Sequence, residues 1–196
     1  MLKVGITGGI GSGKSIICQL FNRLEVPYYS ADKEAKDLIN HHLPIKKEIE
    51  KVFGNEIYNS QGNLDRKKVS ELIFKDKVLL EKLNSIVHPQ VQQHFKDWLS
   101  LNENQKYILK EAAILFESGT YKDLDFIITV IAPVELRINR VIKRDGLTIE
   151  QVKSVMKNQT SDEEKIKLSK YIIVNDDQEL VIPQVLKIHN EILSKA

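Results

Sequence analysis

The sequence predicts an α/β protein with a doubly wound, parallel five-stranded sheet. Three observations support this fold class. An apolar run at residues 2–7 leads into a glycine-rich loop and then into a helical pattern. Further along, apolar runs of strand length alternate with amphipathic helical patterns. Residues 125–131 (DFIITVI) form the clearest buried strand, because a continuous apolar run is typical of a strand covered on both faces.

The glycine-rich loop fits the phosphate-binding template G-x-x-x-x-G-K-[S/T] over residues 8–15 (GGIGSGKS). Glycines let such a loop turn tightly and point its N–H groups at phosphate oxygens, and the following helix adds the positive end of its dipole. We therefore expect a P-loop NTPase fold that binds a nucleoside triphosphate. Lys14 can reach the outer phosphates, and the Ser15 hydroxyl can ligate Mg²⁺. The predicted nucleotide contacts are Gly9, Ile10, Gly11, Ser12, Gly13, Lys14, Ser15 and Ile16.

The remaining elements follow in chain order around this loop. The chain of 196 residues is expected to form one domain. Residues 35–88 hold several helices and no convincing strand, which indicates a helical subdomain inserted between the second and third strands. Strands are expected at 26–30, 107–110 and 171–174. Helices are expected over 16–24, 33–53 (broken near Pro44), 65–74 and 76–87, from His88-Pro89 to 101, and over 179–193. A further helix starts near Pro133 and ends at Gly146, a second runs from Thr148 to about 159, and a third follows from Ser161.

Composition limits the possible partners. A hydrophobic content of 42%, a charged content of 29% and a formal net charge of +2 are ordinary for a globular protein. Because there is no long basic run, no nucleic-acid partner is indicated. No apolar run approaches the roughly 20 residues that span a bilayer, and no signal peptide is recognised, so we expect a cytoplasmic protein without a membrane partner. The single cysteine, Cys18, excludes an internal disulfide and is expected to pack in the core.

Two acidic residues are candidates for the chemistry of phosphoryl transfer. Asp32 follows the second strand, where it could position or deprotonate the acceptor; the alternative is a helix-start residue favoured by the helix dipole. Glu111 ends the third strand, where P-loop proteins commonly place an acid that holds Mg²⁺ directly or through water. The alternative for Glu111 is an ordinary surface charge, because Lys110 interrupts the apolar run.

Three arginines lie on one helix. Arg137, Arg140 and Arg144 are spaced so that they share one face, where they would repel one another unless solvated or neutralised. The alternatives are a solvated basic face and a mobile lid, residues 137–166, that closes over the phosphates. The glycine-rich loop favours the lid.

These residues also carry a family resemblance. TGGIGSGKS at 7–15, Ala31-Asp32, LNSIVHP at 83–89, LFE at 115–117, Arg140, Arg144-Asp145, Gln159 and Asn175 recur in this order. Over essentially its whole length the chain resembles the dephospho-CoA kinases. The resemblance implies Mg²⁺- and ATP-dependent phosphorylation of the ribose 3′-hydroxyl of dephospho-CoA, the last step of coenzyme A synthesis. It implies Asp32 as the base, Lys14 and Arg140 as catalytic partners, Arg144 and Asn175 as ATP contacts, and His88, Leu115, Phe116 and Glu117 beside Asp32 as acceptor contacts.

The chain departs from the family's pattern at several positions. Ser30 stands where Asp is common, Arg137 where Gln is common, and Val155 where Arg is common. We expect Arg137 to matter less than Arg140, and Arg137 is a candidate to replace the lid contact that Val155 removes. Further departures are Ile16 for Thr, Ala113 for Pro and Lys170 for Asp.

Three other functions are alternatives to the one that this resemblance implies. A nucleoside monophosphate kinase would have a similar fold with a helical insertion, so the fold does not separate the two. A GTP-dependent switch requires N-K-x-D and D-x-x-G segments, and neither string occurs. A module that only binds ATP gives no reason for the acid at position 32. The expected partners are ATP and dephospho-CoA, and the expected assembly is a monomer or small homo-oligomer.

Overall fold

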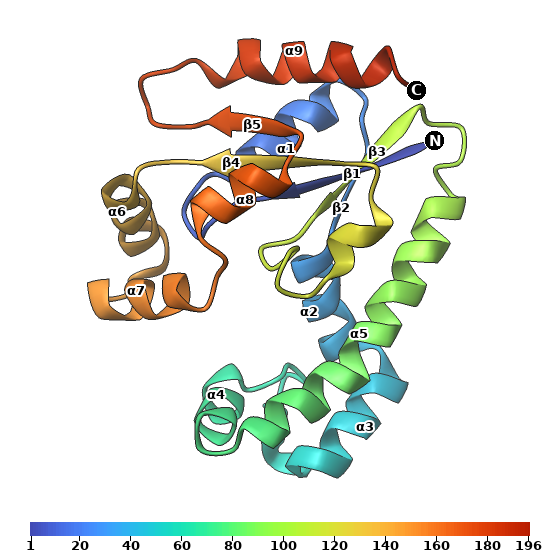
Figure 1. Cartoon of the computed structure of the whole chain (residues 1–196). Helices are drawn as coiled ribbons and strands as arrows, with labels where there is room; N and C mark the ends of the chain where they lie inside the picture. Colours follow the sequence, from blue (N-terminus) through green and yellow to red (C-terminus); the bar gives the residue numbers. More distant parts are fainter. The chain divides into compact units, whose positions relative to one another are not determined.

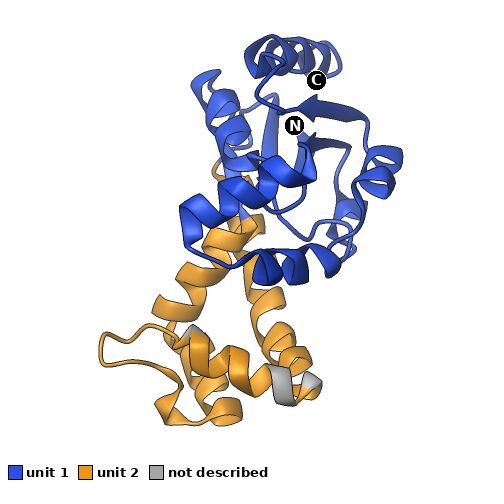
Figure 2. Cartoon of the chain, turned by 90° about the vertical axis from the view of Figure 1, so that its left-hand side faces the viewer, with its two compact units in different colours: residues 1–30, 102–196 blue, residues 31–101 orange. Residues whose placement is uncertain are grey.

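The computed structural model describes residues 1–65, 67–73, 76 and 78–196, together with the helical backbone at 66, 74, 75 and 77. The chain divides into two compact units, one made of residues 1–30 and 102–196 and the other of residues 31–101 (Figure 2). The predicted insertion, 35–88, falls inside the second unit. Each unit is described separately below.

A five-stranded sheet forms the centre of the first unit (Figure 1). The strand order is β2-β3-β1-β4-β5, and every neighbouring pair is parallel. This confirms the predicted sheet. Because all strands are parallel, their carboxyl ends meet at one edge, which is where ligands bind in such folds. The strands are β1 (Leu2–Thr7), β2 (Tyr28–Ser30), β3 (Tyr107–Glu111), β4 (Phe126–Ile131) and β5 (Tyr171–Val174).

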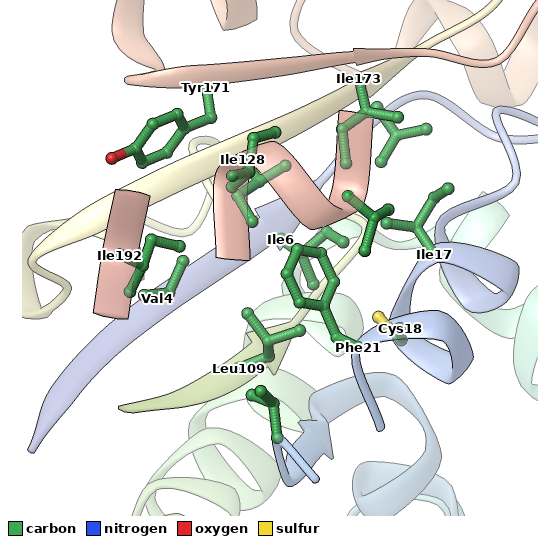
Figure 3. Packing of buried hydrophobic residues seen from close by; sticks show 14 of the residues in the cluster. Val4, Ile6, Ile17, Cys18, Phe21, Leu109, Ile128, Tyr171, Ile173 and Ile192 are labelled. Carbon is green, nitrogen blue, oxygen red and sulfur yellow. The ribbon is translucent and has the colours of Figure 1, made fainter. Parts of the chain in front are cut away.

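Two helices, α1 (Lys14–Arg23) and α9 (Val181–Leu193), cover one face of this sheet. Figure 3 shows Phe21 of α1 and Ile192 of α9 packed among strand residues such as Ile128. All three side chains are fully buried, and burying a side chain of this size contributes about 1.5–3 kcal/mol. The other face is covered in part by α8 (Asp162–Leu168), which contacts β4, and by the 112–124 segment with η2 (Thr120–Asp123).

The helices α6 (Val134–Asp145) and α7 (Ile149–Lys157) follow β4, and both begin and end close to their predicted bounds. Gly146 ends α6 in a left-handed conformation with φ 67°. Thr148 starts α7 with a capping box, in which its side chain and that of Gln151 exchange hydrogen bonds with backbone N–H groups. Val141 and Val152 are buried where these helices pack, and Ile10 of the glycine-rich loop joins their cluster.

The second unit is helical, as predicted. Its buried residues Ile45, Ile49, Ile57, Val69 and Val87 form a separate core. The side chains of Asp65 and Asp76 accept hydrogen bonds from N–H groups in the first turns of the two helices that follow them, which satisfies donors that a helix start leaves unpaired. The elements are α2 (Ala31–His41), α3 (Leu43–Phe53), η1 (Asn55–Ile57), α4 (Arg66–Lys75) and α5 (Lys77–Ser100).

The prediction of a helix boundary at His88-Pro89 is wrong. The helix α5 runs through both residues, and Pro89 lies in its interior. A proline in a helix removes one backbone hydrogen bond and favours a kink or an end. Here the residues on both sides of Pro89 are held by packing, since Val87 is buried and Val91 packs on the same core. Tertiary contacts therefore override the local signal. Over the described residues, none of the helices is long and apolar enough to cross a membrane.

Candidate active site

The glycine-rich loop connects β1 to α1 at the carboxyl edge of the sheet. The Ser12 N–H donates to the Gly9 carbonyl at 3.1 Å, which closes a turn inside the loop. The Lys14 ammonium donates to the Gly8 carbonyl at 2.9 Å, so its side chain bends back over the loop. Gly13 precedes α1 and offers no side chain to cap it. The positive end of α1 therefore faces the loop without a protein carboxylate in the capping position, as an anion site requires.

Asn175 holds this loop from the end of β5, which is separated from β1 by β4 in the sheet. It follows β5 directly, and its backbone N–H donates to the Ile131 carbonyl at the end of β4. Its side-chain amide donates to the Ser12 carbonyl at 2.8 Å. Gly13 has φ 93°, and a Cβ there would lie 2.2 Å from the Asn175 amide nitrogen. The loop therefore requires glycine at position 13 for both its conformation and its contact with Asn175.

Gln159, just beyond α7, holds the loop from a second direction. Its side-chain oxygen accepts a hydrogen bond from the Ile10 N–H at 2.9 Å. Gln159 is one of the residues that carry the family resemblance, but no role was predicted for it. The two residues lie 149 positions apart, so no local pattern could have revealed the pairing.

The three arginines of α6 differ in exposure, so they do not form the solvated basic face that was one of the two alternatives. Their side chains are 7%, 25% and 63% exposed for Arg137, Arg140 and Arg144 respectively. The start of α6 packs against the loop, and exposure rises along the helix from there. Each guanidinium is already paired with a carboxylate: Asp162, Asp177 and Asp145 in the same order. The expected repulsion is thus relieved within the protein.

Arg140 and Arg144 differ in their relation to the loop. Arg140 donates to the Gly11 carbonyl at 3.5 Å while it pairs with Asp177, so it lies at the loop, and its catalytic role stays a prediction. Arg144 makes a two-pronged pair with its neighbour Asp145, with N···O distances of 2.8 and 2.7 Å. That hydrogen bonding raises the pKa of Arg144 above its usual value. The ATP contact predicted for Arg144 stays a prediction.

Glu111 is buried at the end of β3 and is 8% exposed, so the surface-charge interpretation is wrong. It lies opposite Ser30 in the β2–β3 register, and the Ser30 hydroxyl donates to its carboxylate at 2.6 Å. Burial is the main cause that raises the pKa of the nearby Cys18 thiol; the Glu111 charge raises it further, and the Lys14 charge opposes the shift. The charges of Lys14 and Glu111 therefore both act on the same buried thiol, which packs in the core as predicted.

A magnesium ion fits the donors available here. Ser15, which is exposed at the start of α1, and Glu111 offer the hard oxygen atoms that Mg²⁺ prefers. Throughout the part of the chain that the structure describes, no cluster of three or more His, Cys, Asp or Glu side chains could hold a metal ion. This composition suits Mg²⁺, which usually keeps waters and takes most other ligands from substrate phosphates.

The predicted acceptor residues are found in different surroundings. Leu115 is fully buried and packs over Gly5 of β1, and Phe116 packs on the Tyr121 ring, with centroids 5.2 Å apart. The Glu117 carboxylate accepts a hydrogen bond from the Thr160 N–H at 2.6 Å. These contacts give the LFE segment a supporting role within the first unit.

Asp32 and His88 belong to the second unit. Asp32 lies in the first turn of α2, two residues beyond the end of β2, and His88 lies inside α5. The acceptor roles of these two residues and of the LFE segment stay predictions.

A phosphate-binding loop with its lysine, held at the carboxyl edge of a five-stranded parallel sheet, defines a P-loop NTPase fold. Comparisons with known proteins specify which kind. A family model described as dephospho-CoA kinase matches residues 2–180. The chain is 38% identical to a dephospho-CoA kinase of Bacteroides fragilis over 187 residues, which are 95% of this chain and 91% of the relative.

Solved structures agree with this assignment. The structure of TT1252 from Thermus thermophilus has a TM-score of 0.85 and 30% identity, and the match covers 99% of this chain and 97% of that one. A dephospho-CoA kinase from Campylobacter jejuni has a TM-score of 0.72 and 26% identity, with 98% of each chain covered. This chain belongs to the dephospho-CoA kinase family.

Proposed function

We propose that this kinase transfers the γ-phosphoryl group of ATP to the ribose 3′-hydroxyl of dephospho-CoA, giving coenzyme A and ADP. The observation that carries the proposal is the family match over residues 2–180. The phosphate-binding loop independently supports the use of ATP. Its lysine and the uncapped start of α1 fit a triphosphate, and the side chains of Gln159 and Asn175 hold the loop in place.

Phosphoryl transfer proceeds mainly through positioning and electrostatic stabilisation. Residues in the loop and on the elements around it then have the following roles. Lys14 moves from the Gly8 carbonyl to the transferring phosphoryl group, whose charge it stabilises. Ser15 and Glu111 hold Mg²⁺, which neutralises phosphate charge when bound. Arg140, already at the loop through the Gly11 carbonyl, adds a second cation, and Arg144 becomes available to ATP if it leaves Asp145.

Asp32 is the proposed base on the acceptor side. Asp32 follows the end of β2 by two residues in the chain, which supports this role because ligands bind at the carboxyl ends of such strands. A carboxylate there orients the ribose hydroxyl and accepts its proton as the phosphoryl group is transferred. The aspartate is one of the residues that carry the family resemblance.

The two remaining segments supply the acceptor site and the closure. The inserted helical segment, residues 35–88, provides the acceptor site, with His88 among its residues, and residues 137–166 act as a lid over ATP. Closure of such a lid excludes water until the acceptor is bound. We further propose a cytoplasmic enzyme that works as a monomer or a small homo-oligomer.

The experiment that tests this function is ADP release over an acceptor panel of dephospho-CoA, AMP, CMP, UMP and water. We expect dephospho-CoA to raise ADP release by orders of magnitude over every other acceptor. Lys14→Ala should abolish that rate with an unchanged far-ultraviolet circular dichroism spectrum. Lys187→Ala, which removes the same charge from an exposed position on α9, is the matched control and should behave as wild type. Equal ADP release with AMP, or without an acceptor, would overturn the proposal.

A further inference from the structure

Arg137 is buried although it carries a charge. It belongs to the start of α6 and is only 6% exposed. Its guanidinium pairs with the Asp162 carboxylate of α8 at 3.2 Å. Its Nε–H group is also buried and has no hydrogen-bond partner among the described residues. A buried charged group with an unsatisfied donor costs free energy, which other contacts of Arg137 must offset.

The guanidinium lies directly against the first part of the phosphate-binding loop. An ideal Cβ built on Gly9 would lie 1.8 Å from Arg137 Nη1 and 2.9 Å from its Cζ. Gly9 is not among the glycines with positive φ, so its backbone would accept alanine. The demand for glycine at position 9 is therefore steric, and Arg137 is the cause.

A cavity of about 370 Å³ with a mixed polar and apolar lining lies beside this contact, and its lining includes Gly9, Arg137, Gln159, Asp162 and Lys165. The buried Lys165 ammonium donates to the Thr160 carbonyl at 2.8 Å and lies 4.0 Å from the Glu117 carboxylate. The cavity lining carries the positive side chains Arg137, Lys157 and Lys165 and the negative side chains Asp162 and Glu163. Two of these cations, Arg137 and Lys165, already lie within 4.0 Å of a carboxylate. Its lining includes Asp162, the carboxylate that pairs with Arg137.

We propose that Arg137 is a positioning residue for the phosphate-binding loop. With Asp162 orienting it, the guanidinium holds the loop at Gly9, while Gln159 holds Ile10 and Asn175 holds Ser12. Three side chains from separate parts of the chain thus fix three points of one loop, which stays preorganised for triphosphate. Preorganisation strengthens binding because the ordering cost is already met.

The sequence-based expectation that Arg137 matters less than Arg140 concerns kcat, and the proposed role of Arg137 in ATP binding adds to it. That role also changes the relation between Arg137 and Val155. Arg137 is buried at the loop, whereas Val155 is exposed on α7. Arg137 therefore supports the loop from the side instead of replacing a missing contact at position 155.

A double-mutant cycle between positions 9 and 137 tests the proposal, with Mg·ATP affinity measured by calorimetry. We expect Gly9→Ala and Arg137→Ala each to weaken ATP binding about tenfold or more, a change of about 1.4 kcal/mol. The double variant should bind no more weakly than Arg137→Ala alone. Without the guanidinium, the next atom near the new Cβ is an Asp162 carboxylate oxygen at 3.6 Å, an ordinary contact distance. Additive losses would overturn the proposal.

Three further variants separate loop positioning from a general structural role. Arg137→Lys keeps a charge for Asp162 but lacks the planar group over Gly9, so it should recover part of the affinity and tolerate Gly9→Ala. Asp162→Asn should weaken ATP binding less than Arg137→Ala. Lys187→Ala, which removes a positive charge from an exposed position on α9, should leave ATP binding unchanged.

Kinetics provide a second readout. In Arg137→Ala the KM for ATP should rise, while kcat at saturating ATP stays within about threefold of wild type, because only binding is affected. A lower Tm with unchanged ATP affinity in the folded protein would reduce Arg137 to a packing residue and overturn the inference. The turnover assay depends on the proposed function, but the binding cycle does not. If wild type binds ATP yet fails to phosphorylate dephospho-CoA, the function fails and the cycle still decides the role of Arg137.

Discussion

Asn175 offers the sharpest test of how the loop is held. Its amide donates to the Ser12 carbonyl at 2.8 Å and lies at the position that a side chain on residue 13 would occupy. Asn175→Ala removes the donor and leaves that partly buried carbonyl unpaired. Asn175→Asp keeps the shape but turns a negatively charged oxygen toward the carbonyl, and toward the phosphates of a bound nucleotide.

The magnitude follows from the cost of an unpaired buried acceptor. Leaving one unsatisfied costs about 1–3 kcal/mol, and each 1.4 kcal/mol corresponds to about tenfold in affinity. If that energy is what maintains the binding conformation of the loop, ATP affinity should fall about 5- to 150-fold in Asn175→Ala. The loss should be larger in Asn175→Asp, because charge repulsion is added to the lost hydrogen bond.

The assay is ATP calorimetry combined with urea unfolding of the same preparations. Gln184→Ala is the matched control, since the Gln184 side chain makes two hydrogen bonds to the backbone of Val174, one residue before Asn175. It should lower stability by a similar amount while leaving ATP affinity within about twofold of wild type. Wild-type ATP affinity in both Asn175 variants would refute the reasoning.

Three other outcomes are expected. Asp32→Asn should leave ATP affinity nearly unchanged and lower kcat by about 10²–10⁴; near-normal turnover in a coupled assay would make Asp32 a helix-start residue only. Burial lowers the pKa of His189 below 6.5, so the unfolded chain binds the proton more readily and stability should fall as the pH drops through about 6.5. Urea unfolding at pH 7.5 and 5.5 checks this, with a weaker pH dependence expected in His189→Gln but not in the exposed control His41→Gln. The buried Cys18 thiol, with its raised pKa, should resist Ellman's reagent at pH 8 until urea unfolds the protein, and rapid labelling of the native protein would contradict its packing role.

Local patterns were sufficient for most of the sheet. The bounds of β1 and β5 agree with the predicted runs, and β4 differs by one residue, because a strand buried on both faces leaves a continuous apolar run in the sequence. The phosphate-binding loop was equally predictable, since its glycines, lysine and serine are adjacent in the chain. Gly146 and Thr148 marked the end of α6 and the start of α7 for the same reason.

Local signals failed where packing outweighed them. Pro89 predicted a helix boundary, yet α5 continues through it because Val87 and Val91 pack on the second unit's core. Lys110 interrupts the apolar run and so favoured a surface position for Glu111. The carboxylate is buried, and Ser30 across the β2–β3 pair donates a hydrogen bond to it.

The sequence by itself therefore determined the fold class, the phosphate-binding loop and the family, since each depends on residues close together in the chain or on motifs that recur in order. Only the tertiary structure decided which side chains hold the loop: Arg137 at Gly9, Gln159 at Ile10, and Asn175 at Ser12. These contacts join residues more than 100 positions apart. The spacing of the arginines on α6 was visible in the sequence, but their exposure depends on the loop and on α8, which pack against one end of that helix. Burial and long-range hydrogen bonding arise only when the chain has folded, so no local pattern could report them.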